Sequence, residues 1–137
     1  MSNSIVSLHL GQNMDWECEK LVEFNDAFGI AYLGKPSIGD EEMAELRIRL
    51  LEEEVAEYAE AVRNNDLVEV LDALGDIAYI LAGTILNHGL QDVIDDAFSE
   101  IHRSNMDKLV DGKALKRDDG KVIKPDGWKP PNLGQFL

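Results

Sequence analysis

Residues 66–86 read DLVEVLDALGDIAYILAGTIL, a stretch that is apolar nearly all the way round a helix except at its acids. Steps of 100° per residue place Glu69, Asp72 and Asp76 within about 60° of one another. Burying an ionised carboxylate alone is unfavourable by several kcal/mol, and each added like charge raises that cost. Three carboxylates on such a helix therefore predict a cation partner, and a hard divalent metal satisfies that need best.

A second acidic cluster lies one helix upstream, within residues 43–63. Glu54 and Glu57 fall inside the apolar stripe of this helix and Glu53 lies on its edge, whereas a solvated acidic face would lie opposite the leucines. If the two helices pack antiparallel through these faces, the carboxylates meet in one place, with enough oxygen for more than one Mg²⁺. The predicted metal ligands are Glu53, Glu54, Glu57, Glu69, Asp72 and Asp76.

Each cluster also has a simpler interpretation. The glutamates of residues 53–57 can form an ordinary charged surface with Arg47 or Arg49 as ion-pair partners. Glu69 can belong to an Asp-x-x-Glu capping box that begins at Asp66 and binds backbone rather than metal. The two clusters together favour a metal site more strongly than either cluster alone.

Composition limits the class of protein. The chain has 137 residues, one cysteine and a net charge of −14, which favours a single domain in a reducing compartment and argues against nucleic-acid binding. Its first ten residues lack the basic flank and long apolar run of a signal peptide. Its longest near-apolar stretch, residues 77–86, is about half a membrane span. We expect a cytoplasmic protein that does not enter membranes.

Four helices are predicted, at residues 13–28, 41–63, 67–88 and 91–109. Asp40 and Asp66 are the expected N-caps of the second and third helices, and Gly29 is expected to end the first. The predicted fold is an all-α, four-helix-bundle-type domain spanning residues 1–137, with a helical core at about 12–109. The third helix is too apolar for a lone bundle to bury, so we expect a homodimer or homotetramer.

The last thirty residues differ in kind from the rest. Residues 1–107 carry 23 acids against 6 bases, whereas residues 108–137 carry 4 acids against 7 bases. We expect a basic tail at about 110–137, with a short hairpin at Asp119-Gly120 and a proline-stiffened end. Just before it, Arg103, Asn105 and Lys108 either complement the dipole of the fourth helix or bind an anion.

The whole pattern resembles the all-α NTP pyrophosphatase superfamily, specifically the MazG-like and phosphoribosyl-ATP pyrophosphohydrolase-like proteins. Those families carry an EExxE element on one helix and an ExxD element on the next, which here are residues 53–57 and 69–72, with Asp76 one turn further. Residues 22–29 (VEFNDAFG), 101–108 (IHRSNMDK) and 119–124 (DGKVIK) look like one branch of the superfamily. Asn25 and Asp107 depart from that branch, which has His and Ser there.

The resemblance implies a helical bundle that assembles as a dimer or a dimer of dimers. It also implies Mg²⁺-dependent hydrolysis of nucleoside triphosphates to a monophosphate and pyrophosphate, with Mn²⁺ as a substitute metal. Glu53 or Glu54 would act as the general base. The substrate-binding residues would be Arg103, Asn105, Lys108, Lys121 and Lys124, with the tail and Trp128 closing over the nucleotide in the same or a neighbouring subunit.

Two alternatives remain open from the sequence. One is a phosphoribosyl-ATP pyrophosphohydrolase of histidine biosynthesis, which cleaves the same kind of bond with similar carboxylates. The other is a non-catalytic helical interaction module whose acids bind metal only for assembly. Substrate turnover separates the two enzymes from the module.

Overall fold

The computed structural model describes residues 14–137, and within them it contains four α-helices and no strand. The elements are α1 (Asp15–Phe28), α2 (Glu41–Arg63), α3 (Leu67–Asn87), α4 (Ile94–Met106) and a short 3₁₀ helix (Gly134–Phe136). The predicted all-α class is confirmed. The predicted start of the first helix, at residue 13, lies outside the described residues.

The chain divides into two compact units, Met1–Asp92 and Val93–Leu137. The first contains α1, α2 and α3, and the second contains α4 and the tail. The predicted packing of all four helices into one domain stays a prediction. Among the described helices, none combines the length and the apolar character that crossing a bilayer requires.

The predicted helix ends are set by the expected side chains. The Asp40 carboxylate accepts a hydrogen bond from the Met43 N–H at 3.1 Å, and the Asp66 carboxylate accepts one from the Glu69 N–H at 3.1 Å. These bonds satisfy backbone donors that the first helical turn leaves free. α1 ends at Gly29, whose φ of 69° is the left-handed conformation that glycine adopts without strain.

The fourth helix is shorter than the predicted span of residues 91–109. α4 begins at Ile94 and ends at Met106, and residues 91–93 form a turn before it. After it, the chain reverses through Asp111 and Gly112, which have φ angles of 50° and 74°. The apolar periodicity carried no sign of these turns, because Leu109 and Val110 continue the apolar pattern after the helix has ended.

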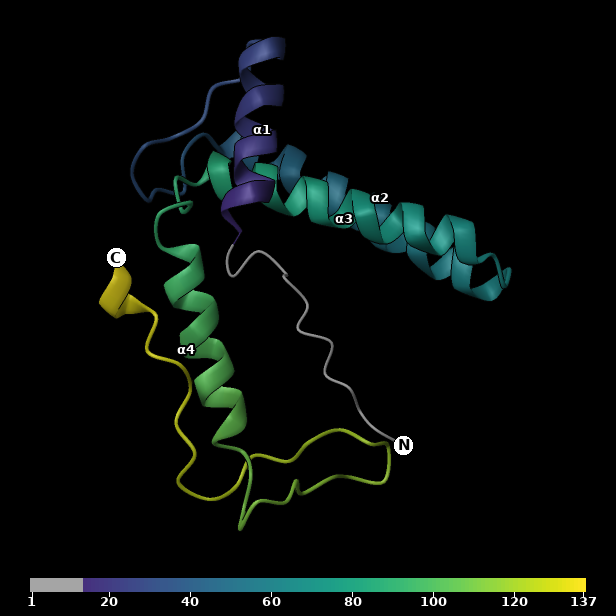
Figure 1. The fold of residues 1–137 in the computed structure, drawn as a ribbon, viewed down its shortest axis with the longest axis vertical. Helices are drawn as coiled ribbons and strands as arrows, with labels where there is room; N and C mark the ends of the chain where they lie inside the picture. Colours follow the sequence, from purple (N-terminus) through teal and green to yellow (C-terminus); the bar gives the residue numbers. More distant parts are fainter. Residues whose placement is uncertain (1–13) are drawn as a thin grey trace. The chain divides into compact units, whose positions relative to one another are not determined.

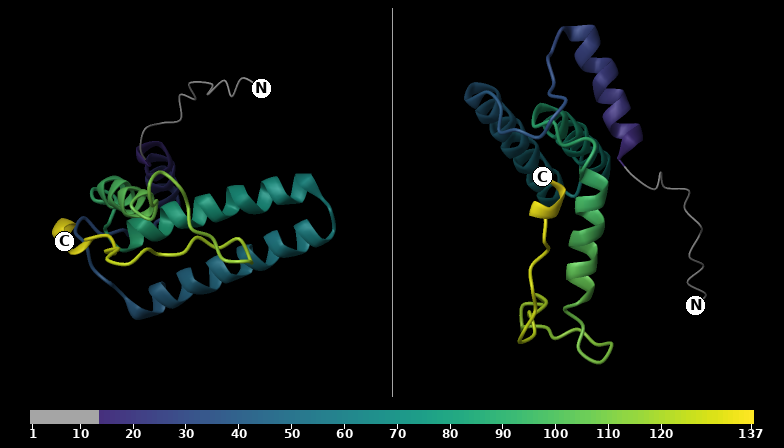
Figure 2. Two further views of the ribbon diagram at one scale, coloured as in Figure 1. Left: turned by 90° about the horizontal axis from the view of Figure 1, so that it is seen from below. Right: turned by 90° about the vertical axis from the view of Figure 1, so that its left-hand side faces the viewer.

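α2 and α3 lie side by side as an antiparallel hairpin (Figures 1 and 2). Near the end away from the connecting turn, Arg47 binds α3 by donating from Nε to Thr84 Oγ1 at 3.0 Å and from Nη2 to the Ile80 carbonyl at 2.8 Å. A Cβ atom at Gly83 would lie 2.6 Å from Arg47 Nη2. Gly83 is therefore the residue that lets Arg47 lie across α3.

α1 packs across α3, where Leu21, Ala82 and Leu86 form a small buried core (Figure 1). The hairpin beyond this crossing is much less covered. Leu67 is 80% exposed, and several other large apolar side chains of α2 and α3 are exposed as well. The described chain therefore buries only part of the apolar surface that its helices carry.

In the second unit, the tail folds back and contacts α4. Trp128 Nε1 donates to the Ser104 carbonyl at 2.7 Å, and the Asn132 N–H donates to Glu100 Oε2 at 2.7 Å. The predicted hairpin turn is present at Gly120, which has a φ of 85°. Only isolated bridges flank it, including Lys116 with Val122, so the predicted hairpin does not develop into strands in the part of the chain that the structure describes.

Candidate metal centre

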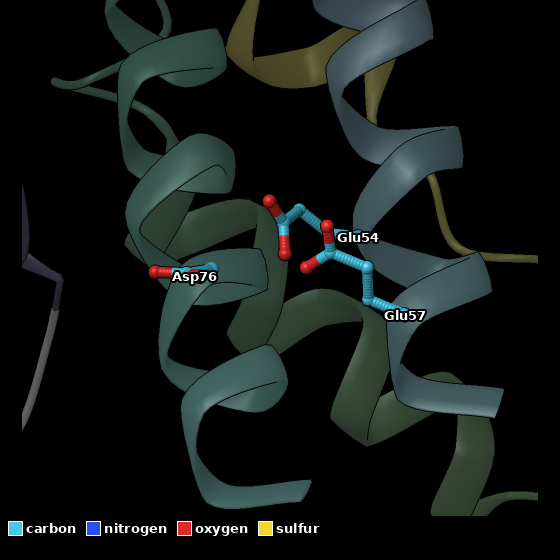
Figure 3. A group of neighbouring side chains, drawn as sticks. All are labelled: Glu54, Glu57 and Asp76. Carbon is cyan, nitrogen blue, oxygen red and sulfur yellow. The ribbon is translucent and has the colours of Figure 1, made fainter. Parts of the chain in front are cut away.

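Three carboxylates from two helices converge in the middle of the α2–α3 hairpin. Glu54, Glu57 and Asp76 each offer one carboxylate oxygen, and these oxygens lie within 4.8 Å of one another (Figure 3). The first two residues are one helical turn apart on α2, so they share a face. The antiparallel packing of α3 brings Asp76 to that face. The sequence predicted this meeting of the two helices through their acidic faces.

Glu54 has the least compensated carboxylate of the group. Its Oε2 is buried and has no hydrogen-bond partner. The pKa of Glu54 is raised, first because burial disfavours its charged form, and then by its close contact with Glu57 and by the negative charges of Glu57, Asp76 and Asp72. A cation placed among these oxygens would stabilise the ionised form that the protein alone disfavours.

No side-chain cation within residues 14–137 forms an ion pair with these three carboxylates. Arg47 lies two helical turns before Glu54, but it donates to the hydroxyl of Thr84 and the carbonyl of Ile80. The contacts of Arg47 therefore do not match the interpretation in which it neutralises the glutamates of a charged surface.

The donor set fits a hard divalent cation. Mg²⁺ binds carboxylate oxygens at about 2.1 Å, so ligands on opposite sides of the ion lie about 4.2 Å apart. The oxygens of Glu54, Glu57 and Asp76 need only a small side-chain movement from their 4.8 Å limit to reach that spacing. The buried, unpartnered Oε2 of Glu54 is the kind of oxygen that such an ion would satisfy.

Two further predicted ligands lie beside this group. Glu69 and Asp72 line a cavity of about 330 Å³ together with Glu57. Asp72 also contributes to raising the pKa of Glu54, so it lies at the edge of the three-acid group. The backbone N–H of Glu69 is capped by Asp66, as the capping interpretation predicted, while the Glu69 side chain lines the cavity.

Glu53 differs from the other predicted ligands. It is exposed on α2 and belongs neither to the three-acid group nor to the cavity lining. Conversely, Glu60 and Asn64 line the cavity, although the sequence placed Glu60 on the solvated face of the helix and did not single out Asn64. The signal for Glu60 was its position three residues after Glu57, on the same side of α2.

Arg103, predicted to bind substrate, lies in the second unit and is already paired. Its Nε and Nη2 donate to the two carboxylate oxygens of Glu100 at 2.6 and 2.9 Å, and its Nη1 donates to Asp107 at 2.6 Å. Glu100 in turn has a pKa lowered to about 2, chiefly by its hydrogen bonds from Arg103 and from the Asn132 backbone. Arg103 therefore reaches a phosphate only by exchanging one of these carboxylates.

The other predicted substrate ligands gather around the docked tail. Lys108 Nζ donates to Asn105 Oδ1 at 2.9 Å. The ammonium groups of Lys108 and Lys124 lie 5.2 and 5.0 Å from the ring centre of Trp128, within the range of cation–π contacts. Lys121 is exposed in the turn. That these residues approach the carboxylates of the first unit stays a prediction.

Comparison with known proteins identifies relatives of this chain. The family model described as phosphoribosyl-ATP pyrophosphohydrolase matches residues 21–105, more than half of the sequence. An uncharacterized protein of Acanthamoeba polyphaga mimivirus is 43% identical over 65 residues, which cover 44% of this chain and 26% of that protein. The matched segment thus spans about a quarter of the viral protein, whose description names no activity.

Proposed function

Because the chain belongs to the phosphoribosyl-ATP pyrophosphohydrolase family, we propose that it is a Mg²⁺-dependent nucleoside triphosphate pyrophosphohydrolase. It would cleave the bond between the α and β phosphates of (deoxy)nucleoside triphosphates, giving a monophosphate and pyrophosphate, and so clean the nucleotide pool. The observation that carries this proposal is the convergence of Glu54, Glu57 and Asp76, which form no ion pair with any cation in residues 14–137.

The carboxylates of the hairpin would hold the metal, with Glu54, Glu57 and Asp76 at its centre and Asp72 and Glu69 beside them. Mg²⁺, when bound, supplies positive charge that offsets the charge of the triphosphate and of the pyrophosphate leaving group.

A general base is also needed, because the attacking water must lose a proton as it bonds to the α-phosphorus. Glu53 or Glu54 would accept that proton. Glu53 lies outside the three-acid group and is exposed, so it is free to contact water. Glu54 could accept the proton only while its carboxylate is free of the metal. Burial and its acidic neighbours raise its pKa, which strengthens a carboxylate as a proton acceptor.

Phosphate binding would fall to the basic residues of the second unit. Lys108 and Lys124 are the better candidates, because their cationic contacts are to the Trp128 ring rather than to a carboxylate. Arg103 would have to leave Glu100 or Asp107 first. Asn105 and Lys121 would add hydrogen bonds to phosphate oxygens or to the sugar.

A screen for pyrophosphate release tests the activity. Purified protein is incubated with dATP, dCTP, dGTP, dUTP and phosphoribosyl-ATP, each with Mg²⁺, with Mn²⁺ and with EDTA. We expect pyrophosphate and the matching monophosphate with either metal and none with EDTA. Metal that stabilises the protein without any turnover on this panel would instead support the non-catalytic interaction module.

Phosphoribosyl-ATP is the second candidate substrate, because the matching family model carries that description. The same screen separates the two enzymes. Hydrolysis of phosphoribosyl-ATP alone would assign the chain to histidine biosynthesis, whereas hydrolysis of several nucleoside triphosphates supports the proposed pool-cleaning role.

We further propose that the chain functions as a homodimer or homotetramer. The support is the exposed apolar surface of the α2–α3 hairpin near its turn, which includes Leu67, Val68 and Leu71. Such contiguous apolar surface is uncommon on a protein that remains a monomer. Sedimentation velocity tests this: we expect a dimer or larger species, and Leu71→Glu should shift it toward the monomer.

A further inference from the structure

A second cavity, of about 800 Å³, lies between α1 and α3 in the same unit as the carboxylates. Its size falls within the range typical of small-ligand sites. Four aromatic side chains contribute to its walls: Trp16, Phe24, Phe28 and Tyr79. Phe24 stacks on Phe28 with ring centres 4.4 Å apart and meets Tyr79 edge-on at 5.7 Å.

The aromatic residues of this cavity are not all part of the core. Trp16 is 62% exposed and Phe28 is 69% exposed, whereas Phe24 is half-buried. Large aromatic side chains are more often found in cores. Lys20 also lines the cavity, and its Nζ lies 5.5 Å from the centre of the Trp16 ring, while Phe24 and Phe28 cover one face of each other. A flat ligand can stack on the aromatic faces that these contacts leave.

The part of the cavity beside Gly75 is not filled by any described atom of the chain. It lies in the cavity wall in the middle of α3, and a Cβ built there would have nothing within 4 Å. Glycine inside a helix is less favourable than alanine, because it loses more backbone freedom on folding. Gly83 has a reason for its missing side chain in Arg47, whereas no described atom explains Gly75. The space therefore suits something from outside the described chain.

Glu17 indicates what that ligand must offer. This residue lines the cavity, and its Oε2 is buried without a hydrogen-bond partner. Turning this carboxylate toward the cavity breaks no hydrogen bond at Oε2. A carboxylate accepts hydrogen bonds and cannot donate them. The ligand should therefore bring N–H donors to the cavity.

The cavity and the carboxylate centre share one stretch of α3, because Gly75 directly precedes Asp76 and Tyr79 follows it by about one turn. We infer that this aromatic cavity binds the base of the nucleotide whose phosphates bind at Glu54, Glu57 and Asp76, and that the base is guanine. The inference rests on the proposed pyrophosphohydrolase function and names the substrate of that site.

Guanine is the base whose edge matches a carboxylate. Its ring N–H and exocyclic amino group lie side by side, so both oxygens of Glu17 can accept from one base. Uracil presents a single N–H between two carbonyls, and those carbonyls repel a carboxylate. Adenine and cytosine present an amino group next to a ring nitrogen that only accepts. Enzymes commonly distinguish bases through this edge together with stacking.

The first test measures kcat/KM for dGTP and dUTP in the wild type and in Glu17→Gln. A hydrogen bond to a charged group is worth about 1.5–3 kcal/mol, so Glu17→Gln should lower kcat/KM for dGTP about 10- to 100-fold and for dUTP less than about 3-fold. Glu19→Gln is the matched control, because Glu19 is an exposed acid of α1 outside the cavity lining. It should leave both values within about 2-fold.

The second test does not depend on turnover. Binding of dGMP in EDTA is followed by calorimetry and by quenching of tryptophan fluorescence, which Trp16 in the cavity wall should report. Gly75→Leu places a side chain into the open space and should remove dGMP binding while leaving the circular dichroism and Tm intact. Gly75→Ala is its control and should bind dGMP within about 3-fold of the wild type.

The outcomes separate this inference from the proposed activity. If no triphosphate is hydrolysed but dGMP binds and Gly75→Leu abolishes that binding, the activity is wrong and the base site stands. Hydrolysis of all bases with similar kcat/KM, together with no dGMP binding, overturns the base site and keeps the activity. A change of sedimentation in Gly75→Leu with dGMP binding unaltered overturns it too, because the cavity is then a contact between copies.

Discussion

Acidic side chains occur in two opposite electrostatic settings in this chain. Glu100 of α4 receives hydrogen bonds from Arg103 and from the backbone of Asn132, and its pKa falls to about 2. Glu54 of α2 lies among Glu57, Asp76 and Asp72, and its pKa rises because burial and these neighbours disfavour its charge. The acid of α4 is satisfied by hydrogen bonds within the chain, whereas the acids of the hairpin have no ion-pair partner among residues 14–137.

Arg103 and Arg47 account for the different electrostatic settings of the acids on α4 and α2. Arg103 follows Glu100 by three residues, so it lies on the same face and both of its ion pairs form along one helix. Arg47 lies on the carboxylate side of α2, but its donors are taken by Thr84 and Ile80. Its charge therefore stabilises the contact between helices rather than the carboxylates.

The largest expected effect comes from removing a charge on the hairpin. Glu57→Gln should lower kcat/KM for the preferred triphosphate at least about 100-fold, because the transition state loses a charge that holds the metal. Steady-state pyrophosphate release measures this. Glu52→Gln, an exposed acid of the same helix, should change the rate less than about 2-fold. Near-full activity of Glu57→Gln would show that the negative charge of Glu57 has no role in catalysis.

Metal should stabilise the hairpin and leave the α4 network unaffected. At a Mg²⁺ concentration of about 100 times its Kd, the free energy of unfolding should rise by about 2.7 kcal/mol. Glu54→Gln should weaken that response and raise the Tm of the metal-free protein by about 2–4 °C, since it removes a disfavoured charge. Thermal melts with and without Mg²⁺ measure both effects. Glu100→Gln should keep the full Mg²⁺ response. Loss of the Mg²⁺ response in this variant would show that the α4 network and the hairpin carboxylates are not independent.

The pH dependence of the two settings should have opposite signs. The pKa of Glu54 is higher in the folded than in the unfolded protein, so metal-free protein should gain stability as the pH falls from 7 toward 4.5, the ordinary glutamate value. Glu100 has a folded pKa of about 2, so its contribution is present above 4.5 and is lost as the pH falls from 4.5 to 2. Residue-resolved amide hydrogen exchange in EDTA checks this. Parallel responses in α2 and α4 would contradict it.

The smallest expected effect concerns the tail. Trp128→Phe removes the hydrogen bond to the Ser104 carbonyl and should release the tail from α4 at a cost of about 1 kcal/mol. Limited proteolysis should then cut residues 110–132 several times faster. Trp16→Phe changes the other tryptophan and should leave the tail cleavage rate unaltered. Equal cleavage of the Trp128→Phe variant and the wild type would show that Trp128 does not hold the tail.

Local chemistry made much of this fold predictable from sequence. The side chains of Asp40 and Asp66 cap helices where expected, and Gly29 ends one in the left-handed conformation. Helical periodicity also placed Glu54, Glu57 and Asp76 on facing helix surfaces, because a rotation of 100° per residue needs no tertiary knowledge. The convergence of these three acids followed once α2 and α3 packed antiparallel.

Contacts that depend on side-chain rotamers and on neighbouring segments could not be predicted from the sequence. Spacing alone did not separate Glu53, which lies outside the three-acid group, from Glu54 within it. The pairing of Arg103 with Glu100 depends on rotamers. The end of α4 at Met106 precedes turns at Asp111 and Gly112 that the apolar pattern did not indicate. The open side of Gly75 likewise becomes visible only when α1 is in place.

The contact of Arg47 with Thr84 and Ile80, beside Gly83, has a consequence for the proposed metal site. Two points pin the hairpin lengthwise, the short turn at one end and this contact toward the other, and the carboxylates lie between them. Helices held near both ends resist sliding past each other, so the proposed metal would meet carboxylate oxygens at a fixed spacing, and that spacing would favour ions of one radius. A methyl group at Gly83, two helical turns from Asp76, would displace Arg47, so the proposed site would lose its fixed spacing and its preference for one ionic radius.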